Sequence, residues 1–258
     1  LLTNAEAKGL ADQITRDPAQ GVAVAQAALT GAGPEAARQV MREVGQQDQA
    51  SIFVHVADLA AGGQSNFAET VVRGLGLKGQ KLALDPDVRG DIAARMTALA
   101  PAMAGMPSLP GIVKATAEAA ALADAQAGKV QSADYYIASA LGSSSRGGRT
   151  YGGVRAHNGQ AVLIPSWLDR EYVDDVMDFL AEGWAVGERG PVDTAGQPLP
   201  EHRLRKGKMT LLPNGRYLLT VGGTVPQSRD GQPFTFDLDK ARDGLRRRFG
   251  RDVVLEGW

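Results

Sequence analysis

The sequence predicts a mainly α-helical protein, in which an irregular bundle or array of helices is followed by a small α+β domain with antiparallel hairpins. Residues 1–141 are rich in alanine and repeat apolar side chains at helical spacing. Residues 142–149 are mostly Gly and Ser, which is typical of a linker. The Asn158-Gly159 pair then introduces hairpin signals. We therefore expect a helical domain over 1–141, a linker over 142–149 and an α+β domain over 150–258.

The first 141 residues contain a series of helix start and stop signals. Thr3 and Glu6 have the spacing of a capping box. Asp17-Pro18 and Asp85-Pro86 each place a capping side chain before a proline at the first helical position. Helices are predicted to begin near Thr3, Asp17, Pro34, Asp48, Ser65, Asp85, Pro110 and Ser132, with Gly31 ending the second. Short helices separated by such breaks favour antiparallel helix pairs in a bundle or a short array.

The second part of the chain alternates strand and turn signals. Asn158 and Gly159 tolerate the positive φ of a type I′ turn, so they join strands over 154–157 and 160–164, with Pro165 ending the second strand. The remaining expectations are a helix after Asp169 with an apolar stripe of Tyr172, Val173, Val176, Met177 and Leu180, a loop over 185–207 with a helical turn after Pro200, a hairpin over 208–221, a strand over 233–237 and a closing helix capped by Asp239. These elements predict an antiparallel sheet with helices.

Composition limits the class of protein. The chain has 258 residues, 43% hydrophobic and 22% charged, which is typical of a globular protein, but only 5% aromatic. The core therefore has to rest on Ala, Leu and Val. The absence of cysteine excludes disulfides, thiol catalysis and Cys-ligated metals. A net charge of −1 is not typical of a nucleic-acid-binding domain, and no apolar run reaches the roughly 20 residues of a membrane span.

Two patterns could hold phosphate or metal. Gly74-Leu-Gly-Leu-Lys-Gly79 matches the letters of a dinucleotide-binding loop, but a helix is expected before it rather than a strand, so we interpret it as a helix end. Two carboxylate clusters could bind Ca²⁺ or Mg²⁺. The first cluster is Asp85, Asp87 and Asp91, in the opening turns of a predicted helix, where negative charge is favourable. The second is Asp174, Asp175 and Asp178, on the helix face opposite an apolar stripe. We therefore interpret both clusters as solvated helix faces rather than as metal sites.

Histidine and serine could supply catalytic groups. His55, His157 and His202 are isolated from one another, without the spacing of metal ligands. His55 is interpreted as a hydrogen-bonded core residue, His157 as an exposed residue before the turn, and His202 as a conceivable general base in a loop. Ser143-Ser144-Ser145 lacks the surroundings of a nucleophile and is interpreted as linker.

The remaining candidates are a carboxylate site and a basic cluster. Glu182 and Glu188 near Trp184 could supply the acid of a glycoside hydrolase, but Trp184 and Trp167 are better interpreted as anchors of the core or of an interface. Arg246, Arg247 and Arg248, with Arg242 and Arg251, are interpreted as a solvated helix end rather than a phosphate site. We therefore assign no catalytic, cofactor-binding or metal-binding residue.

Several stretches of the chain resemble one family. In the first part they are Asp17 to Ala25, Val40 to Gly45, Val56 to Gly62 and Val72 to Leu75; in the second they are Gly152 to Pro165, Leu211 to Leu218 and Gly231 to Leu238. Together they resemble the C-terminal region of the large internal virion, or ejection, proteins of tailed phages and prophages. Those proteins often carry a lytic transglycosylase domain elsewhere in the polypeptide, and its catalytic glutamate has no counterpart in this chain.

The resemblance implies a non-enzymatic structural part of a virion, located in the capsid interior or tail and acting through protein–protein contacts. It implies portal, tail or core subunits and further copies of the chain as partners, and contact with genome DNA or with the host periplasm and envelope during ejection. Two alternatives remain open: a peptidoglycan-degrading enzyme whose catalytic domain lies outside this sequence, or a bacterial helical scaffold. The start at Leu1-Leu2 rather than Met leads us to expect a fragment of a longer protein.

Overall fold

The computed structural model describes residues 3–17, 20–24, 27, 51–79, 82–187, 190–250 and 253–254, which fall into two compact units. Unit 1 comprises residues up to 98 together with 108–142, and unit 2 comprises 99–107 together with 143–257. A helical first part is followed by an α+β part, so the fold class predicted from the sequence is confirmed.

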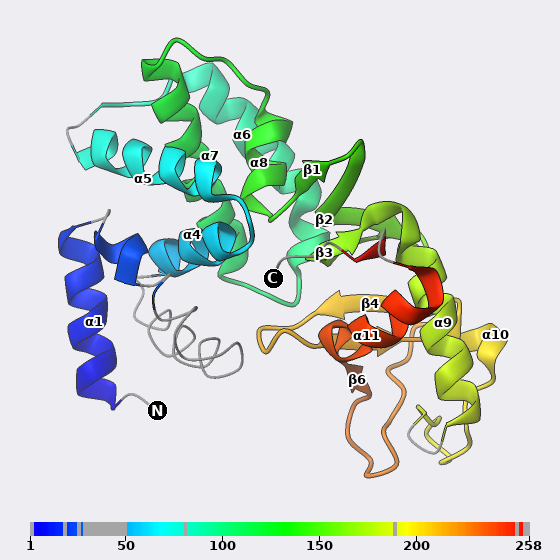
Figure 1. The fold of residues 1–258 in the computed structure, drawn as a ribbon. Helices are drawn as coiled ribbons and strands as arrows, with labels where there is room; N and C mark the ends of the chain where they lie inside the picture. Colours follow the sequence, from blue (N-terminus) through cyan, green and yellow to red (C-terminus); the bar gives the residue numbers. More distant parts are fainter. Residues whose placement is uncertain are drawn as a thin grey trace. The chain divides into compact units, whose positions relative to one another are not determined.

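Unit 1 contains helices alone among its described residues (Figure 1). They are α1 (Asn4–Arg16), α4 (Ser51–Ala61), α5 (Ser65–Gly79), α6 (Pro86–Leu99), α7 (Leu109–Gln126) and α8 (Ala133–Ala140). The predicted capping box is confirmed, since Thr3 accepts from the Glu6 amide and Glu6 from the Thr3 amide. Ser132 caps α8 as predicted by accepting from the Tyr135 amide. The helix expected at Pro34 and its preceding stop at Gly31 lie outside the described residues.

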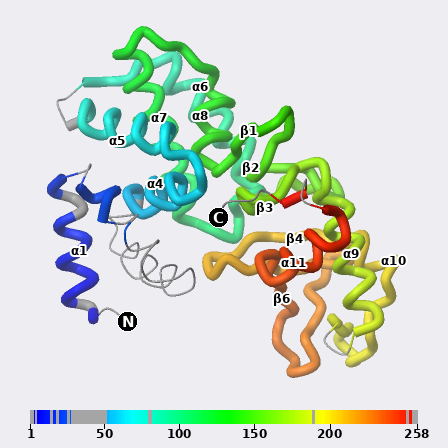
Figure 2. Tube along the Cα trace, viewed as in Figure 1, coloured from blue at the N-terminus to red at the C-terminus, as the bar shows by residue number. Residues whose placement is uncertain are grey.

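Helices α5 and α7 make the closest helix packing in unit 1. They lie side by side in both backbone views (Figures 1 and 2). A Cβ at Gly74 would lie 1.8 Å from the carbonyl oxygen of Ala119, so only glycine permits this approach. Small side chains are buried on several sides of α7: Ala117, Ala119, Ala120, Ala121 and Ala123. At Gly74, α5 and α7 are therefore held by backbones that come close together rather than by large side chains.

Unit 2 contains two three-stranded antiparallel sheets, one of order β1-β2-β3 and one of order β4-β5-β6. The strands are β1 (Ser144–Arg146), β2 (Arg149–His157), β3 (Gln160–Asp169), β4 (Lys208–Leu211), β5 (Tyr217–Thr220) and β6 (Thr235–Phe236). The helices are η1 (Ala100–Met103), η2 (Arg170–Tyr172), α9 (Val173–Val186), α10 (Glu201–Leu204) and α11 (Leu238–Phe249). The connection from β5 to β6, orange in Figure 2, makes a long excursion before returning to the sheet.

The hairpin predicted at Asn158-Gly159 is confirmed. His157 pairs with Gln160, and φ is 47° at Asn158 and 71° at Gly159, as a type I′ turn requires. The expectation that Pro165 ends the second strand is wrong, because β3 continues to Asp169. The register shifts between Gly153 and Tyr151, so the missing amide of Pro165 falls where the ladder is already interrupted.

The predicted linker is not a separate segment in the structure. Residues 144–146 form β1, which pairs with the start of β2 across the Gly147-Gly148 turn. Unit 2 also takes in Leu99–Pro107, which the sequence analysis places in the helical domain. Ala102 and Met103 of η1 are buried, and η1 contacts β3 and β4. The chain thus leaves unit 1, contributes one turn of helix to unit 2 and returns.

Aspartates begin both main helices of unit 2. Asp169 accepts from the Glu171 amide and starts η2, which leads into α9 with the predicted apolar stripe turned inward. For α11 the expected cap is wrong. Asp237 makes the capping bond, to the Asp239 amide, and Asp239 instead accepts from the indole nitrogen of Trp167 at 2.6 Å.

Aromatic rings fill the core of unit 2. Trp184 packs edge-on against Phe234 and Phe236, with ring centroids 5.2 and 4.9 Å away. Tyr217 stacks on Phe236 and donates its hydroxyl to the carbonyl of Leu163 at 3.0 Å. Burial raises the pKa of Tyr217, so the phenol remains a donor. The prediction that Trp184 anchors the core is confirmed.

Candidate functional site

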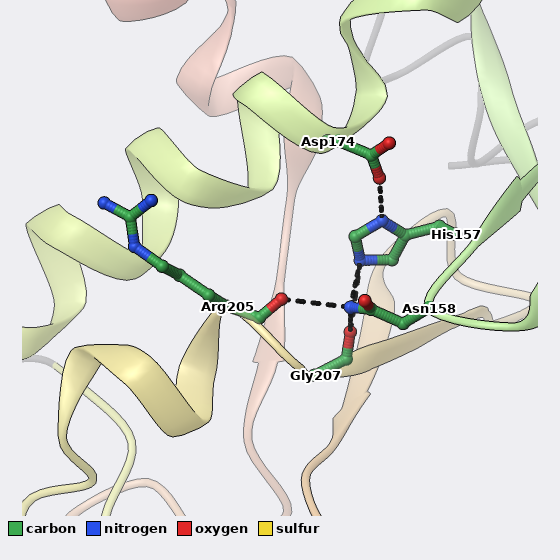
Figure 3. A network of polar contacts seen from close by, with 5 residues as sticks. All are labelled: His157, Asn158, Asp174, Arg205 and Gly207. Atoms are coloured by element: carbon green, nitrogen blue, oxygen red, sulfur yellow. Dashed lines mark hydrogen bonds and ion pairs between the residues drawn. The ribbon is translucent and has the colours of Figure 1, made fainter.

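A polar network of unit 2 lies at the hairpin turn and contains His157. The expectation that this histidine is exposed is wrong: only 4% of its surface is accessible. Its Nδ1 lies 2.6 Å from a carboxylate oxygen of Asp174 on α9, and its Nε2 lies 3.1 Å from the carbonyl of Gly207 (Figure 3). Residue His157 is buried because the segment before β4 passes directly beside the turn.

The side chain of Asn158 extends this network. Its amide nitrogen lies 3.0 Å from the carbonyl oxygen of Arg205 and 2.8 Å from that of Gly207, and 3.0 Å from Nε2 of His157 (Figure 3). Asparagine therefore serves two purposes here: it tolerates the positive φ of the turn, and it binds the turn to a segment almost fifty residues further along the chain.

The network positions backbone rather than presenting a reactive group. In a catalytic His–carboxylate pair, the second ring nitrogen must reach a nucleophile or a substrate proton. Here Nε2 of His157 faces the Gly207 carbonyl and the Asn158 amide, both of which are protein groups. Asp174, with a 66% exposed side chain, orients the ring from the solvent side. The arrangement fits a clamp between the first hairpin and the second sheet.

The two acidic clusters serve local structure. Asp85 accepts from the Asp87 amide at the start of α6, which is the helix-start role favoured by the sequence. In the second cluster, Asp174 pairs with His157, and Asp178 lies 2.6 Å from Arg205, which also pairs with Glu201. No group of three possible metal ligands occurs among the described residues.

The glycine motif and the serine run lie in regular structure. Gly74 and Gly76 are inside α5, and Gly79 is its last residue, so the motif is helix rather than a phosphate-binding loop. Ser144 and Ser145 pair with Tyr151 and Thr150 in the first sheet, as part of β1 rather than of a linker. The side chain of Ser143 accepts from Arg170.

The other two histidines differ in environment. His55 donates from Nε2 to the carbonyl of Ala140 at 2.7 Å, which confirms the interpretation of a hydrogen-bonded histidine. Burial lowers the pKa of His55 below its usual value, an effect that the bond to Ala140 partly offsets. His202 is exposed on the short helix α10.

The remaining candidates occupy three places in unit 2. Trp167 is buried and lies under the guanidinium of Arg242, 5.5 Å from its ring centroid. Arg246, Arg247 and Arg248 are exposed in the last turn of α11, as the sequence predicts. Glu182 is exposed on α9, whereas Glu188 and Arg251 lie outside the described residues.

Unit 1 contains a pocket that the sequence analysis does not predict. Its volume is about 190 Å³, and it is lined by Asn66, Phe67, Thr70, Asp124, Lys129, Gln131 and Tyr135. The rings of Phe67 and Tyr135 meet edge-on at 6.4 Å on one side. The carboxylate of Asp124, which also lines the pocket, accepts from the hydroxyl of Tyr136 at 3.2 Å. Burial, and secondly the charge of Asp124, raise the pKa of Tyr136 to about 12.

Exposed apolar surface adjoins this pocket. Val130, in the turn between α7 and α8, is 90% exposed, and Tyr135 is 47% exposed. Their neighbours Lys129 and Gln131 line the pocket. In the sequence, the only signal for this surface is a valine between polar residues in a turn, where no local packing needs it.

Comparisons of this chain with protein-family models, with curated proteins and with solved structures give no match. Across the described part of the chain, none of the helices combines the length and apolar character needed to cross a bilayer.

Proposed function

We propose that this chain is a structural part of a tailed-phage virion, in the internal core or tail, and that it works through protein–protein contacts. The proposal rests on the resemblance of its sequence to phage internal virion proteins and on one structural observation: the exposed apolar rim of the pocket in unit 1. No step of catalysis enters the proposal.

The rim has the composition of an interface centre. Protein interfaces are anchored by aromatic side chains beside small pockets, with polar groups around them. Here Tyr135 and Val130 stand next to a pocket whose volume suits one inserted side chain. Polar side chains of Asn66, Lys129 and Gln131 surround it. We assign this surface to contact with a second copy of the chain, as expected for a repeated virion subunit.

Size-exclusion chromatography with light scattering tests this assignment. The protein should elute with a mass above the 27.1 kDa of one chain, and the mass should fall with dilution. Val130→Asp combined with Tyr135→Ser should return it to a single chain. Val186→Ser is the matched control, because Val186 is 85% exposed but lies on α9 in unit 2, and it should leave the mass unchanged.

Two results would overturn the proposal. The first is a single chain at every concentration, with no change on altering the rim. The second is clearance of peptidoglycan by this protein that is lost when one glutamate, such as Glu182, is replaced by glutamine. The second result would support an enzyme instead.

A further inference from the structure

Two arginine side chains meet on one face of β2. The guanidinium of Arg170 donates from Nε to the carbonyl of Gly152 at 2.8 Å and from an Nη to the hydroxyl of Ser143 at 3.2 Å. It lies directly over Gly153, where an added Cβ would be 2.5 Å from the same Nη. The missing side chain at Gly153 therefore provides the space that Arg170 occupies.

Arg155 lies two residues beyond Gly153 on the same strand. Residues two apart in a strand project from the same face, so Arg155 is the next side chain along from the Arg170 guanidinium. Burial, and secondly the charge of Arg155, lower the pKa of Arg170 below its ordinary value. Two positive charges are thus held close together in a partly buried position.

Within the part of the chain that the structure describes, the acidic groups nearby do not balance these charges. Arg149 is neutralised by the buried carboxylate of Asp169 at 3.1 Å. Arg155 has a much weaker ion pair, 4.0 Å from Glu171, whose side chain is 76% exposed. The Nε of Arg155 is buried without a hydrogen-bond partner. Asp174, on the adjacent helix, is engaged with His157. Among the described residues, Arg155 therefore has one weakly held carboxylate partner, and Arg170 has no carboxylate partner.

We propose that Arg155 and Arg170 form a binding site for one oxyanion of the phosphate class. Planar guanidinium groups bind phosphate oxygens through pairs of N–H bonds, and these charge-assisted bonds are stronger than neutral ones. An anion between the two arginines removes their mutual repulsion. The side chain of Arg155 is 37% exposed, so a ligand reaches it from solvent. This site lies in unit 2 and does not depend on the proposed virion role.

Free inorganic phosphate and a phosphate of a nucleic-acid backbone offer the same chemistry. Free phosphate presents all its oxygens to the two guanidinium groups, whereas a backbone phosphodiester presents two. Both are tested on the full chain, with ionic strength held at about 0.15 M so that screening does not change. The probes are inorganic phosphate and a short single-stranded oligodeoxynucleotide.

Titration calorimetry with phosphate is the first measurement. Arg155→Gln should weaken binding at least tenfold. Arg229→Gln removes one positive charge from an exposed turn elsewhere in unit 2 and should change affinity less than twofold. Glu171→Gln should bind phosphate more tightly than the unchanged protein, because the carboxylate that competes for Arg155 is gone. A purely structural Arg155 would not produce this increase.

The folded state of each variant is checked by thermal unfolding without phosphate. Arg155→Gln should melt no lower than the unchanged protein, since it removes a repulsion. Absence of phosphate binding, or equal binding by the unchanged protein and Arg155→Gln, overturns the proposal, as does a large loss of stability in Arg155→Gln. Binding of the oligonucleotide that also requires Arg155 identifies the phosphodiester as a ligand; phosphate binding alone identifies the free anion.

Discussion

The two units of this protein are stabilised in different ways. Unit 1 buries mainly alanine on α7 and brings α5 within backbone contact at Gly74. Unit 2 buries tryptophan, tyrosine and phenylalanine, whose rings contact one another around Phe236. An aromatic ring buries about 150–250 Å² of surface, whereas a methyl group buries far less. The α5–α7 packing of unit 1 therefore rests on many small contacts, whereas the ring cluster of unit 2 rests on a few large ones.

This difference determines which substitutions each unit tolerates. Close helix packing leaves no space for one added carbon, so unit 1 should be sensitive to small increases in volume. A ring cluster leaves a large cavity when one ring is removed, so unit 2 should be sensitive to losses of volume.

The largest effect is expected for Gly74→Ala in unit 1. The new Cβ would lie 1.8 Å from the carbonyl oxygen of Ala119, so α5 and α7 must separate. We expect a loss of more than about 3 kcal/mol in the free energy of unfolding, because the obstruction is backbone and cannot rotate away. This loss is measured by urea unfolding, followed by far-UV circular dichroism.

Gly76→Ala is the matched control for this substitution. Gly76 lies two residues further along α5, and nothing comes within 4 Å of its added Cβ. Alanine favours helix over glycine by about 0.5–1 kcal/mol, so this variant should be more stable than the unchanged protein. If Gly74→Ala and Gly76→Ala have the same free energy of unfolding, close packing of α5 on α7 does not stabilise unit 1.

Phe236→Ala should produce an effect of similar size, in unit 2. The ring stacks on Tyr217 and meets Trp184 edge-on, and its loss should cost about 3–5 kcal/mol. In a Trp258→Phe background, Trp167 and Trp184 report unit 2 by fluorescence. The fluorescence transition should move to lower urea, while the dichroism change from the helices of unit 1 stays in place. Equal movement of both signals would show that the two cores unfold as one.

Replacement of Asn158 tests the clamp between the two sheets of unit 2. Asn158→Gly keeps the turn conformation but loses the bonds to Arg205 and Gly207, which should cost about 1–2 kcal/mol. Asn158→Ala adds the strain of a positive φ, for a total of about 2–3 kcal/mol. Asn214→Ala, in an exposed turn, should cost less than 1 kcal/mol, as about one hydrogen bond is lost. If Asn158→Gly has the same free energy of unfolding as the unchanged protein, the clamp is contradicted.

The smallest predicted effect is a pH dependence in unit 1. The pKa of His55 is lowered in the folded state, so the unfolded chain binds a proton more readily below about pH 6.5. Stability should therefore be complete above that pH and fall as the pH drops through it. His55→Gln retains a donor for the Ala140 carbonyl and should reduce this dependence. Identical pH profiles of the two proteins would show that His55 makes no contribution.

Local signals in the sequence predicted much of the fold. The capping box at Thr3, the Asn158-Gly159 turn and the cap at Ser132 each depend on a few neighbouring residues, and the structure confirms them. Three expectations failed because distant contacts decide them. Pro165 stays inside β3 because β3 itself bulges there, with residues 165–168 opposite Gly152 alone. Asp239 is engaged by Trp167, and His157 is buried by the segment that precedes β4.

The candidate sites were harder to predict for the same reason. The glycine motif at Gly74 was correctly interpreted as helix rather than as a phosphate loop, but nothing in the local sequence shows that Gly74 faces Ala119. The pocket combines residues of α5, α7 and α8, and the Arg155–Arg170 pair combines a strand with the helix that follows the next strand. Proximity of this kind depends on tertiary packing, which a single sequence does not encode in any local pattern.

The excursion of Leu99–Pro107 into unit 2 has a consequence for the order of events on the ribosome. These residues contact β3 and β4 through η1, and β4 is completed only at Leu211, about 100 residues later. Translation at about 5–20 residues per second leaves the segment without its sheet for about 5–20 s. During that time Ala102 and Met103, buried in the finished protein, remain exposed to other nascent chains and to chaperones. Unit 2 thus cannot complete this part of its core until β4 has been made.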